Sequence, residues 1–186
     1  LGSDWVVTTI AGQALQAGSV DAANADARFN RPNGIAIDSS GSLFVVDHYN
    51  HTIRKATPTA GDWVVTTIVG MPGVSGSDDG LNAEARFYSP TGIAIDNGGT
   101  LYVTDTLNNT VRAVTPAGAD WVVSTLAGLP DIYGDFVDGY GFDARFWSPT
   151  FMTIDTSTNL YVADWGNNVI RQMSPEGSDW MVTTIA

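Results

Sequence analysis

The ionisable side chains of this 186-residue chain form few of the groupings that enzymes use. Because there is no cysteine, disulfides, thiolate metal sites and cysteine nucleophiles are excluded. The two histidines, His48 and His51, are neighbours in one short stretch, so a three-histidine zinc site cannot form within a single chain. A Ser-His-Asp triad can be drawn, but no nucleophile motif accompanies it. We therefore predict a protein that is not an enzyme and uses no cofactor.

Acidic side chains are the remaining candidates for chemistry. Asp131, Asp135 and Asp138 crowd one segment, residues 129–143, and Asp78 and Asp79 add two carboxylates to another. Calcium prefers several such oxygen ligands, but this spacing matches no regular calcium loop. We therefore predict no metal site, and leave calcium binding in these segments as an open alternative.

Overall charge narrows the class of partner. The chain carries 20 acidic against 8 basic residues, a formal net charge of −12. DNA, RNA and anionic membranes would be repelled, because affinity for them depends largely on Lys and Arg. We thus expect no nucleic-acid and no membrane partner. A surface rich in Thr, Ser, Asn and Gly with a single lysine favours an extracellular or cell-surface location. Since the first residue is Leu1, we expect a processed product or part of a longer protein.

A recurring polar pattern indicates the architecture. Each copy has an Asp, an Asn three residues later and an Arg seven residues later, and copies recur every 58 or 59 residues. Asp can accept hydrogen bonds from backbone N–H groups in a tight turn, and the Arg can reach back to that carboxylate as a bidentate partner. We predict that each trio stabilises one turn: Asp47, Asn50 and Arg54; Asp105, Asn108 and Arg112; Asp164, Asn167 and Arg171.

The segments around each trio read as four short strands. In the first copy these are residues 33–38, 43–47, 52–57 and 62–68, rich in β-branched and aromatic residues and bounded by Gly, Pro, Asn or Asp. Tandem four-stranded units are typical of β-propeller blades. The predicted fold is therefore all-β, with three blades over residues 13–70, 71–128 and 129–186.

The pattern D-x-x-N-[HN]-x-[IV]-R, together with the segment "ARFNRPNGIAID" that precedes the first strand, resembles the NHL repeat family of β-propellers. The resemblance covers essentially the whole chain. It implies blades that usually close as a ring of six and usually bind partners. A minority of the family are enzymes, including lyases with metal-bound histidines, which this chain lacks. The third copy departs from the pattern by placing Phe151 where the others have glycine.

The chain has one more outer strand than it has blades. "DWVVTTI" at residues 4–10 repeats the outer strand at residues 62–68, so we expect residues 1–12 to form an extra outer strand. Three blades cannot close a ring, and an open arc leaves apolar flanks in water. Three alternatives remain open: half of a longer propeller chain, a two-chain ring, or an open, filament-like assembly that shares strands. The residues expected on the assembly strands are Trp5, Val7 and Trp180.

One face of the arc is the candidate binding surface. Turns between second and third strands share a side with the connectors at residues 12–26, 70–84 and 128–143, because the strands alternate in direction. Exposed aromatic residues in loops mark binding sites for proteins or carbohydrates, although they can equally pack down over the blade. The predicted binding residues are His48, Tyr49, Leu107, Trp165, Tyr133, Phe136, Tyr140 and Phe142.

Two N-glycosylation sequons begin at Asn50 and Asn108. Both asparagines are also the turn residues that the repeat requires, and the third copy breaks the sequon with Val169. We interpret the sequons as a coincidence of the turn pattern.

Overall fold

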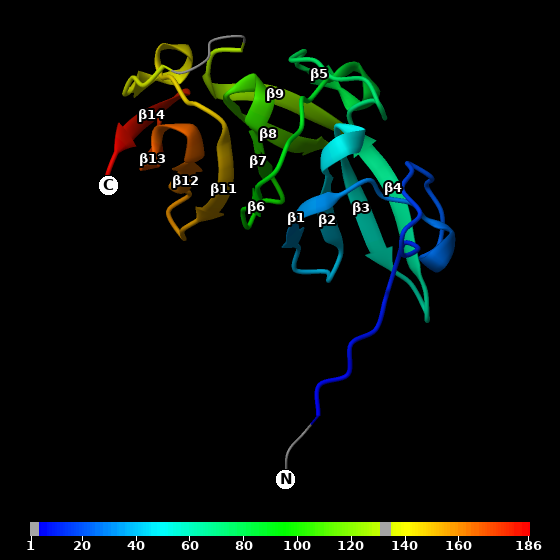
Figure 1. Ribbon diagram of the computed structural model, residues 1–186. Helices are drawn as coiled ribbons and strands as arrows, with labels where there is room; N and C mark the ends of the chain where they lie inside the picture. Colours follow the sequence, from blue (N-terminus) through cyan, green and yellow to red (C-terminus); the bar gives the residue numbers. More distant parts are fainter. Residues whose placement is uncertain (1–3, 131–134) are drawn as a thin grey trace.

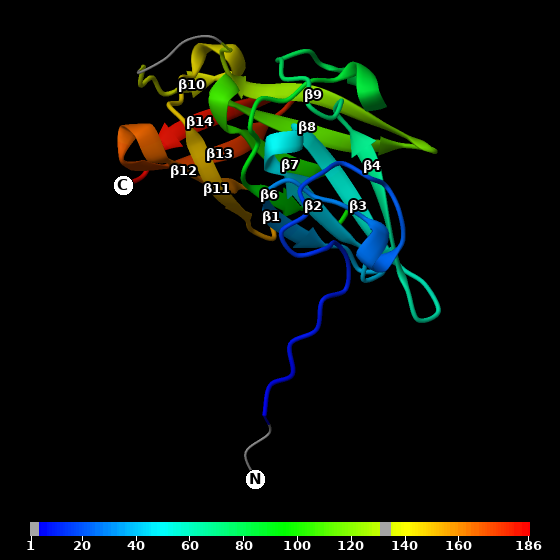
Figure 2. The same ribbon diagram turned by 45° about the vertical axis from the view of Figure 1, so that its right-hand side comes forward.

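A computed structural model describes residues 4–130 and 135–186, which form three antiparallel sheets standing side by side as a fan (Figure 1). The second view shows the same arc of three sheets (Figure 2). In the described part of the chain the only helices are short 3-10 turns, labelled η1 to η6. The all-β, propeller-type prediction is confirmed: the sheets are blades, and the arc is not closed.

Each blade contains the four predicted strands within a residue or two. Blade 1 consists of β1 (Pro32–Ile37), β2 (Leu43–Asp47), β3 (Thr52–Pro58) and β4 (Trp63–Val69). Blade 2 contains β6 (Ile93–Ile95), β7 (Leu101–Asp105), β8 (Thr110–Ala117) and β9 (Asp120–Gly128). Blade 3 contains β11 (Pro149–Ile154), β12 (Leu160–Asp164), β13 (Val169–Glu176) and β14 (Asp179–Thr184).

Short local signals account for the turns. The Asp that directly follows each first strand accepts two backbone N–H groups of the hairpin turn; Asp38 accepts from Ser40 and Ser42, both at 2.9 Å. Asp96 and Asp155 do the same in blades 2 and 3. These Asx-type turns set where the second strand begins, which is why the hairpins could be read from the sequence.

The connectors hold an element that the sequence analysis missed. β5 (Gly80–Leu81) pairs with β9, and β10 (Gly139–Tyr140) pairs with β14, so each connector adds a short fifth strand outside the blade that follows it. In blade 1 the same contact is a single bridge between Ala23 and Val64. Part of each blade's outer edge is therefore covered, which limits strand addition from another chain at that edge.

The two junctions between blades contain most of the apolar core. Between blades 1 and 2, Phe44, Val46 and Ile53 pack against residues of blade 2 that include Phe87 and Leu101. Between blades 2 and 3, Tyr102 and Val111 pack against Phe146, Leu160 and Val162. Sheet faces at the two ends of the arc have no blade beside them in this structure, and apolar residues there stay exposed.

The expected extra outer strand does not form a ladder within this chain. Residues 4–10 belong to no strand, and Trp5 and Val7 are 96% and 94% exposed. Figure 1 shows this segment extending away from blade 1. Trp180, expected on the last outer strand, lies in β14 and packs edge-on against Tyr102 of blade 2 at 5.6 Å. Its part in an assembly stays a prediction.

Candidate binding surface

The Asp-Asn-Arg trio forms a buried network at the end of each second strand. In blade 1, Asp47 accepts hydrogen bonds from the Asn30 backbone N–H at 2.6 Å, Asn50 Nδ2 at 2.7 Å and Arg54 Nη1 at 2.8 Å. His51 follows in the left-handed conformation with φ of 59°. Asp105 and Asp164 make the same three bonds in blades 2 and 3. The predicted structural role of the trio agrees with this geometry.

The arginine differs from the prediction in one respect. Arg54 gives Asp47 only one nitrogen and uses Nη2 and Nε for a second carboxylate, Asp21, at 2.6 and 3.1 Å. Arg112 and Arg171 also bridge to a second carboxylate, Asp79 and Asp138, but through Nη2 alone. The bidentate pairing expected within the trio is thus wrong, because the guanidinium joins two acids from different segments. The repeat carried a signal, since the second acid precedes its arginine by 33 residues in every blade, but spacing alone does not show that the connector returns to the guanidinium.

The second acid also fastens the connector to the outer strand. Asp21 accepts the backbone N–H of Thr67 in β4 at 2.9 Å, and Asp138 accepts that of Thr184 in β14 at 3.1 Å. Burial acts to raise the pKa of Asp138, but the Thr184 N–H and hydroxyl and the Arg171 guanidinium outweigh it and lower that pKa. These carboxylates are therefore committed to the scaffold. Within residues 4–130 and 135–186, no cluster of three or more His, Asp or Glu could hold a metal ion.

The central carboxylates are shielded from water. Asp105 and Arg112 are fully buried, and the Arg112 guanidinium lies 5.1 Å above the ring of Phe87. Burial raises the pKa of Asp105 to about 6, against the opposing effects of Arg112, Asn108 and the Tyr88 N–H. Such groups are closed to substrate, so the raised pKa of Asp105 reflects burial within the scaffold and does not mark a catalytic group.

The second-to-third strand turns, built as η2 (His48–Asn50), η4 (Thr106–Asn108) and η6 (Trp165–Asn167), form what we call the loop face. His48 Nδ1 lies 2.8 Å from the carbonyl of Pro90 in blade 2, and its ring stacks on Tyr49 at 4.8 Å. Tyr49 is 44% exposed, and the Arg31 guanidinium lies 4.6 Å above its ring. Leu107 is half-buried, whereas Trp165 is 70% exposed. The turns thus present aromatic side chains, as expected.

The aromatic residues of the third connector do not stay together. The Asp135 carbonyl accepts a hydrogen bond from Asn167 Nδ2, and the Phe136 ring lies 5.1 Å from the Arg171 guanidinium, which places Phe136 at the loop face. Tyr140 pairs with Met181 and donates its hydroxyl to Glu176 at 2.7 Å.

Glu176 ends β13 at the turn into β14, at the far end of that strand from η6. Tyr140, in β10, and Phe142, in the adjoining η5 (Gly141–Asp143), therefore belong to the outer rim, and their assignment to the loop face is wrong. The connector runs down the outer strand before it returns. Tyr133 lies outside the described residues.

Two aromatic residues on the loop face were missed. Tyr88 and Trp147 are 38% and 42% exposed, and each donates its backbone N–H to the central Asp of its blade. The residues beside them in the turns are Leu107 and Gly166, whose backbone N–H groups bond to their carbonyls. A signal existed, since both follow the triplet Ala-Arg-Phe in the repeat. We define the loop-face aromatics as Tyr49, Tyr88, Phe136, Trp147 and Trp165.

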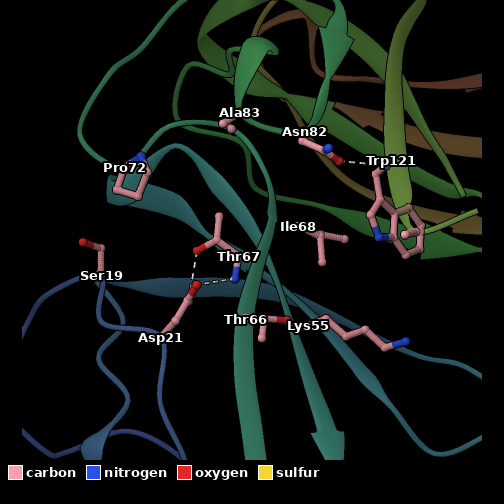
Figure 3. Close-up of a pocket in the computed structure, with 12 residues that line it drawn as sticks. Ser19, Asp21, Lys55, Thr66, Thr67, Ile68, Pro72, Asn82, Ala83 and Trp121 are labelled. Atoms are coloured by element: carbon pink, nitrogen blue, oxygen red, sulfur yellow. Dashed lines mark hydrogen bonds between the residues drawn. The ribbon is translucent and has the colours of Figure 1, made fainter. Parts of the chain in front are cut away.

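A separate groove lies between blades 1 and 2 (Figure 3). It has a volume of about 710 Å³ and is lined by β4 residues, by Asn82 and Ala83 of η3 (Asn82–Glu84), and by Trp121 of β9. Lys55, the single lysine of the chain, also lines it, with its ammonium 5.3 Å above the ring of Phe44. Asp21 and Asn82 are already engaged there, by Thr67 and Trp121 (Figure 3). The sequence could not reveal this groove, because two blades must pack to form it.

Comparison with known proteins agrees with this geometry. The NHL repeat family model matches residues 29–56 and 87–113. The NHL repeat-containing protein 2 of Bos taurus is 32% identical over 99 residues, which is 52% of this chain and 13% of that protein. Teneurin-3 of Danio rerio is 27% identical over 173 residues, 81% of this chain and 6% of that protein. The chain therefore spans only a small part of the length of these relatives.

Among solved structures, an auxiliary nutrient binding protein from Bacteroides ovatus superposes with a TM-score of 0.68 at 20% identity. The match covers 88% of this chain and 39% of that one. At this identity the likeness concerns the fold alone. No helix among the described residues has the length and apolar character needed to cross a membrane.

Proposed function

We propose, from the premise that this chain belongs to the NHL repeat family, that it is a non-catalytic binding module whose loop face takes a protein or carbohydrate ligand. The observation that carries the proposal is that charged and aromatic groups have different roles in the blades. The buried Asp and Arg groups pair with one another inside the scaffold, whereas the loop-face aromatics are exposed to solvent. Large, rigid aromatic side chains are the groups that most often dominate binding energy.

Three further points support the proposal. A protein that shares this fold is an auxiliary nutrient binding protein, which is consistent with a propeller used for binding. Charge of −12 disfavours polyanionic ligands and fits a neutral glycan or a basic protein surface. We place the module outside the cell or on its surface, because its composition has few lysines and many hydroxyl and amide side chains.

The test compares two matched double variants. Tyr88→Ala with Trp147→Ala removes two loop-face aromatics, whereas Tyr140→Ala with Phe142→Ala removes two exposed aromatics of the outer rim. The wild type and both double variants would be applied to an array of neutral oligosaccharides and to an array of extracellular protein domains. We expect the loop-face variant to lose binding at least about tenfold, the effect of a single hot spot, and the rim variant to bind as the wild type does.

The opposite pattern, or equal binding by both variants, would reject the loop face as the site. Circular dichroism and urea unfolding establish that each variant is folded. The non-catalytic assignment fails if the purified chain turns over a substrate and the loop-face variant does not.

Self-association is the second candidate function, and a different observation favours it. Ile35 on the free side of blade 1 is 60% exposed, whereas its repeat equivalent Ile93 is 7% exposed inside the first junction. Apolar sheet faces of this kind are usually covered by a partner. The native mass, measured by light scattering on a sizing column, tests this directly. Removal of residues 1–12 should abolish an assembly that depends on the unpaired Trp5 segment and leave ligand binding intact.

A further inference from the structure

Both internal junctions depend on a glycine in the innermost strand region. A Cβ on Gly34 of β1 would lie 2.4 Å from the Thr91 carbonyl oxygen of blade 2. A Cβ on Gly92 would lie 2.3 Å from the Thr150 carbonyl oxygen of blade 3. A carbon and a non-bonded oxygen do not approach this closely, so the spacing between neighbouring inner strands requires a residue without a Cβ. Neither glycine has a φ in the left-handed region, which leaves steric fit as the reason.

Blade 3 has a phenylalanine at the same repeat position. Phe151 lies in β11 and is 62% exposed, because no fourth blade stands beside it. Around it, the outward flank of blade 3 has the residue types of a junction. Ile170 is 40% exposed, whereas its equivalents Ile53 and Val111 in blades 1 and 2 are fully buried. The flank is therefore half of a junction with one atypical residue at its inner edge.

The free flank of blade 1 is the matching half. It carries Ile35, the equivalent of Ile93, and Asn33, whose carbonyl is the equivalent of that of Thr91. If the blade 3 flank of one copy met the blade 1 flank of a second copy with the internal spacing, Phe151 would face Asn33 of that second copy. The Cβ of Phe151 would then stand where only a glycine fits.

We propose that Phe151 is a steric stop that prevents two copies from closing head to tail into a regular six-bladed ring. This inference rests on the proposed self-association, since it specifies which partner surface is meant and what limits it. The partner surface is the blade 1 flank of a second copy, and the limiting atom is the Cβ of Phe151. If wild-type copies associate, they therefore do not form a closed ring. The Phe151 side chain keeps the innermost strands of the two copies apart where blade 3 of one copy meets blade 1 of the other.

The segment before Gly12 affects the outer side of the same contact between blade 3 of one copy and blade 1 of the other. The Gly12 N–H bonds to the Asn24 carbonyl at 2.9 Å, as the Gly70 N–H bonds to the Asn82 carbonyl at 3.0 Å. Residues up to Gly12 therefore reach blade 1 as β4 reaches blade 2, in the position of an outer strand of a preceding blade. In a closed pair this segment would compete with β14 of the second copy. The test is therefore made both in the full chain and in a chain lacking residues 1–10.

The experiment compares Phe151→Gly with Phe151→Ala. Both remove the aromatic ring and its apolar area, but only glycine removes the Cβ. Sedimentation equilibrium and light scattering over a range of protein concentrations report the mass of each variant. We expect Phe151→Gly to form a discrete two-chain particle, whereas Phe151→Ala, like the wild type, should form none even at concentrations at least about tenfold higher.

Three results would overturn the steric stop: equal behaviour of the Gly and Ala variants, a wild type that is already a discrete two-chain particle, or monomers throughout both series. Phe151→Ala weaker than wild type would instead identify the ring as a contact. A monomeric wild type beside a two-chain Phe151→Gly variant would reject self-association of the natural chain and still support the stop. If Phe151→Gly does not fold, the converse substitution Gly92→Ala, which adds a Cβ inside an intact junction, must destabilise the protein or the premise fails.

Discussion

The junction between blades 1 and 2 and the free flank of blade 3 use the same repeat positions in opposite circumstances. Ile53 is fully buried in the junction, whereas its counterpart Ile170 is 40% exposed on the flank. Gly34 meets the neighbouring carbonyl at the inner edge, where the flank has Phe151. Whether a repeat position is buried therefore depends on whether a neighbouring blade is present. The residue type at that position determines whether a neighbouring blade can pack against it.

The comparison also separates interactions within a blade from those between blades. The Asp-Asn-Arg network is complete in all three blades, including the end blade, because its partners come from the blade and its own connector. The apolar contacts, in contrast, need two sheets. Stability of the arc thus combines one local term for each blade with one term for each junction.

The largest effect is expected from breaking the network itself. Arg112→Ala in the middle blade would leave Asp105 buried without its ion-pair partner and should lower the free energy of unfolding by about 3–5 kcal/mol. Arg171→Ala in the end blade should cost a similar amount, because that network is equally buried. Urea unfolding of both variants measures this. A clearly smaller cost for Arg171→Ala would show that the network depends on the neighbouring blade.

A smaller effect should distinguish the junction from the flank. Ile93→Ala should cost about 2–4 kcal/mol, since it opens a cavity between blades 1 and 2. The matched change Ile35→Ala, at a position 60% exposed, should cost less than about 1 kcal/mol. Unfolding of the two variants at low protein concentration gives the difference. Equal costs would mean that the flank of blade 1 is covered in solution.

The requirement for glycine at the inner edge of each junction predicts a third difference in stability. Gly34→Ala adds a methyl group within 2.4 Å of a carbonyl oxygen, and should cost about 1–3 kcal/mol as the junction is forced apart. Gly41→Ala has open space around it and serves as a control for the steric contact, although its φ of 84° carries its own backbone strain. Thermal unfolding with the crystal structure of Gly34→Ala would show whether β1 and β6 have separated. An unchanged distance between β1 and β6, with unchanged stability, would contradict the requirement for glycine.

The smallest effect on stability is expected at Asp138, at the outer edge of blade 3, and it should depend on pH. Asp138 has a lowered pKa, so its ionised form favours the folded state; this contribution is complete above the ordinary pKa of 3.8 and is lost as the pH falls through the lowered value. Because the side chain is 44% exposed, we expect Asp138→Asn to cost only about 0.2–1 kcal/mol at pH 7. Urea unfolding at pH 7 and near pH 3 measures both values. A difference that persists unchanged in acid would rule out the charge as its source.

Much of the scaffold could be predicted from the residues alone. β-Branched runs, the Asp that directly follows each first strand and the Asp-Asn-Arg spacing are local signals, and each corresponds to a strand or turn within a residue or two. The second partner of each arginine was missed although it precedes the arginine by 33 residues in every blade, since only the folded connector brings Asp21 to Arg54. The same path explains why Tyr140 and Phe142 were wrongly assigned to the loop face.

Local signals along the chain were enough to specify the blade: three copies of one unit, each with the charged groups that stabilise its turn. The reason is that these interactions lie within a hairpin or a short segment, where spacing along the chain is close to spacing in three dimensions. The packing of the sheets was needed to show which aromatics share a face, where the groove beside Lys55 lies, and that Phe151 stays exposed on a free flank. Those properties depend on the contact of one sheet with the next, and neighbouring sheets are about 58 residues apart in the chain.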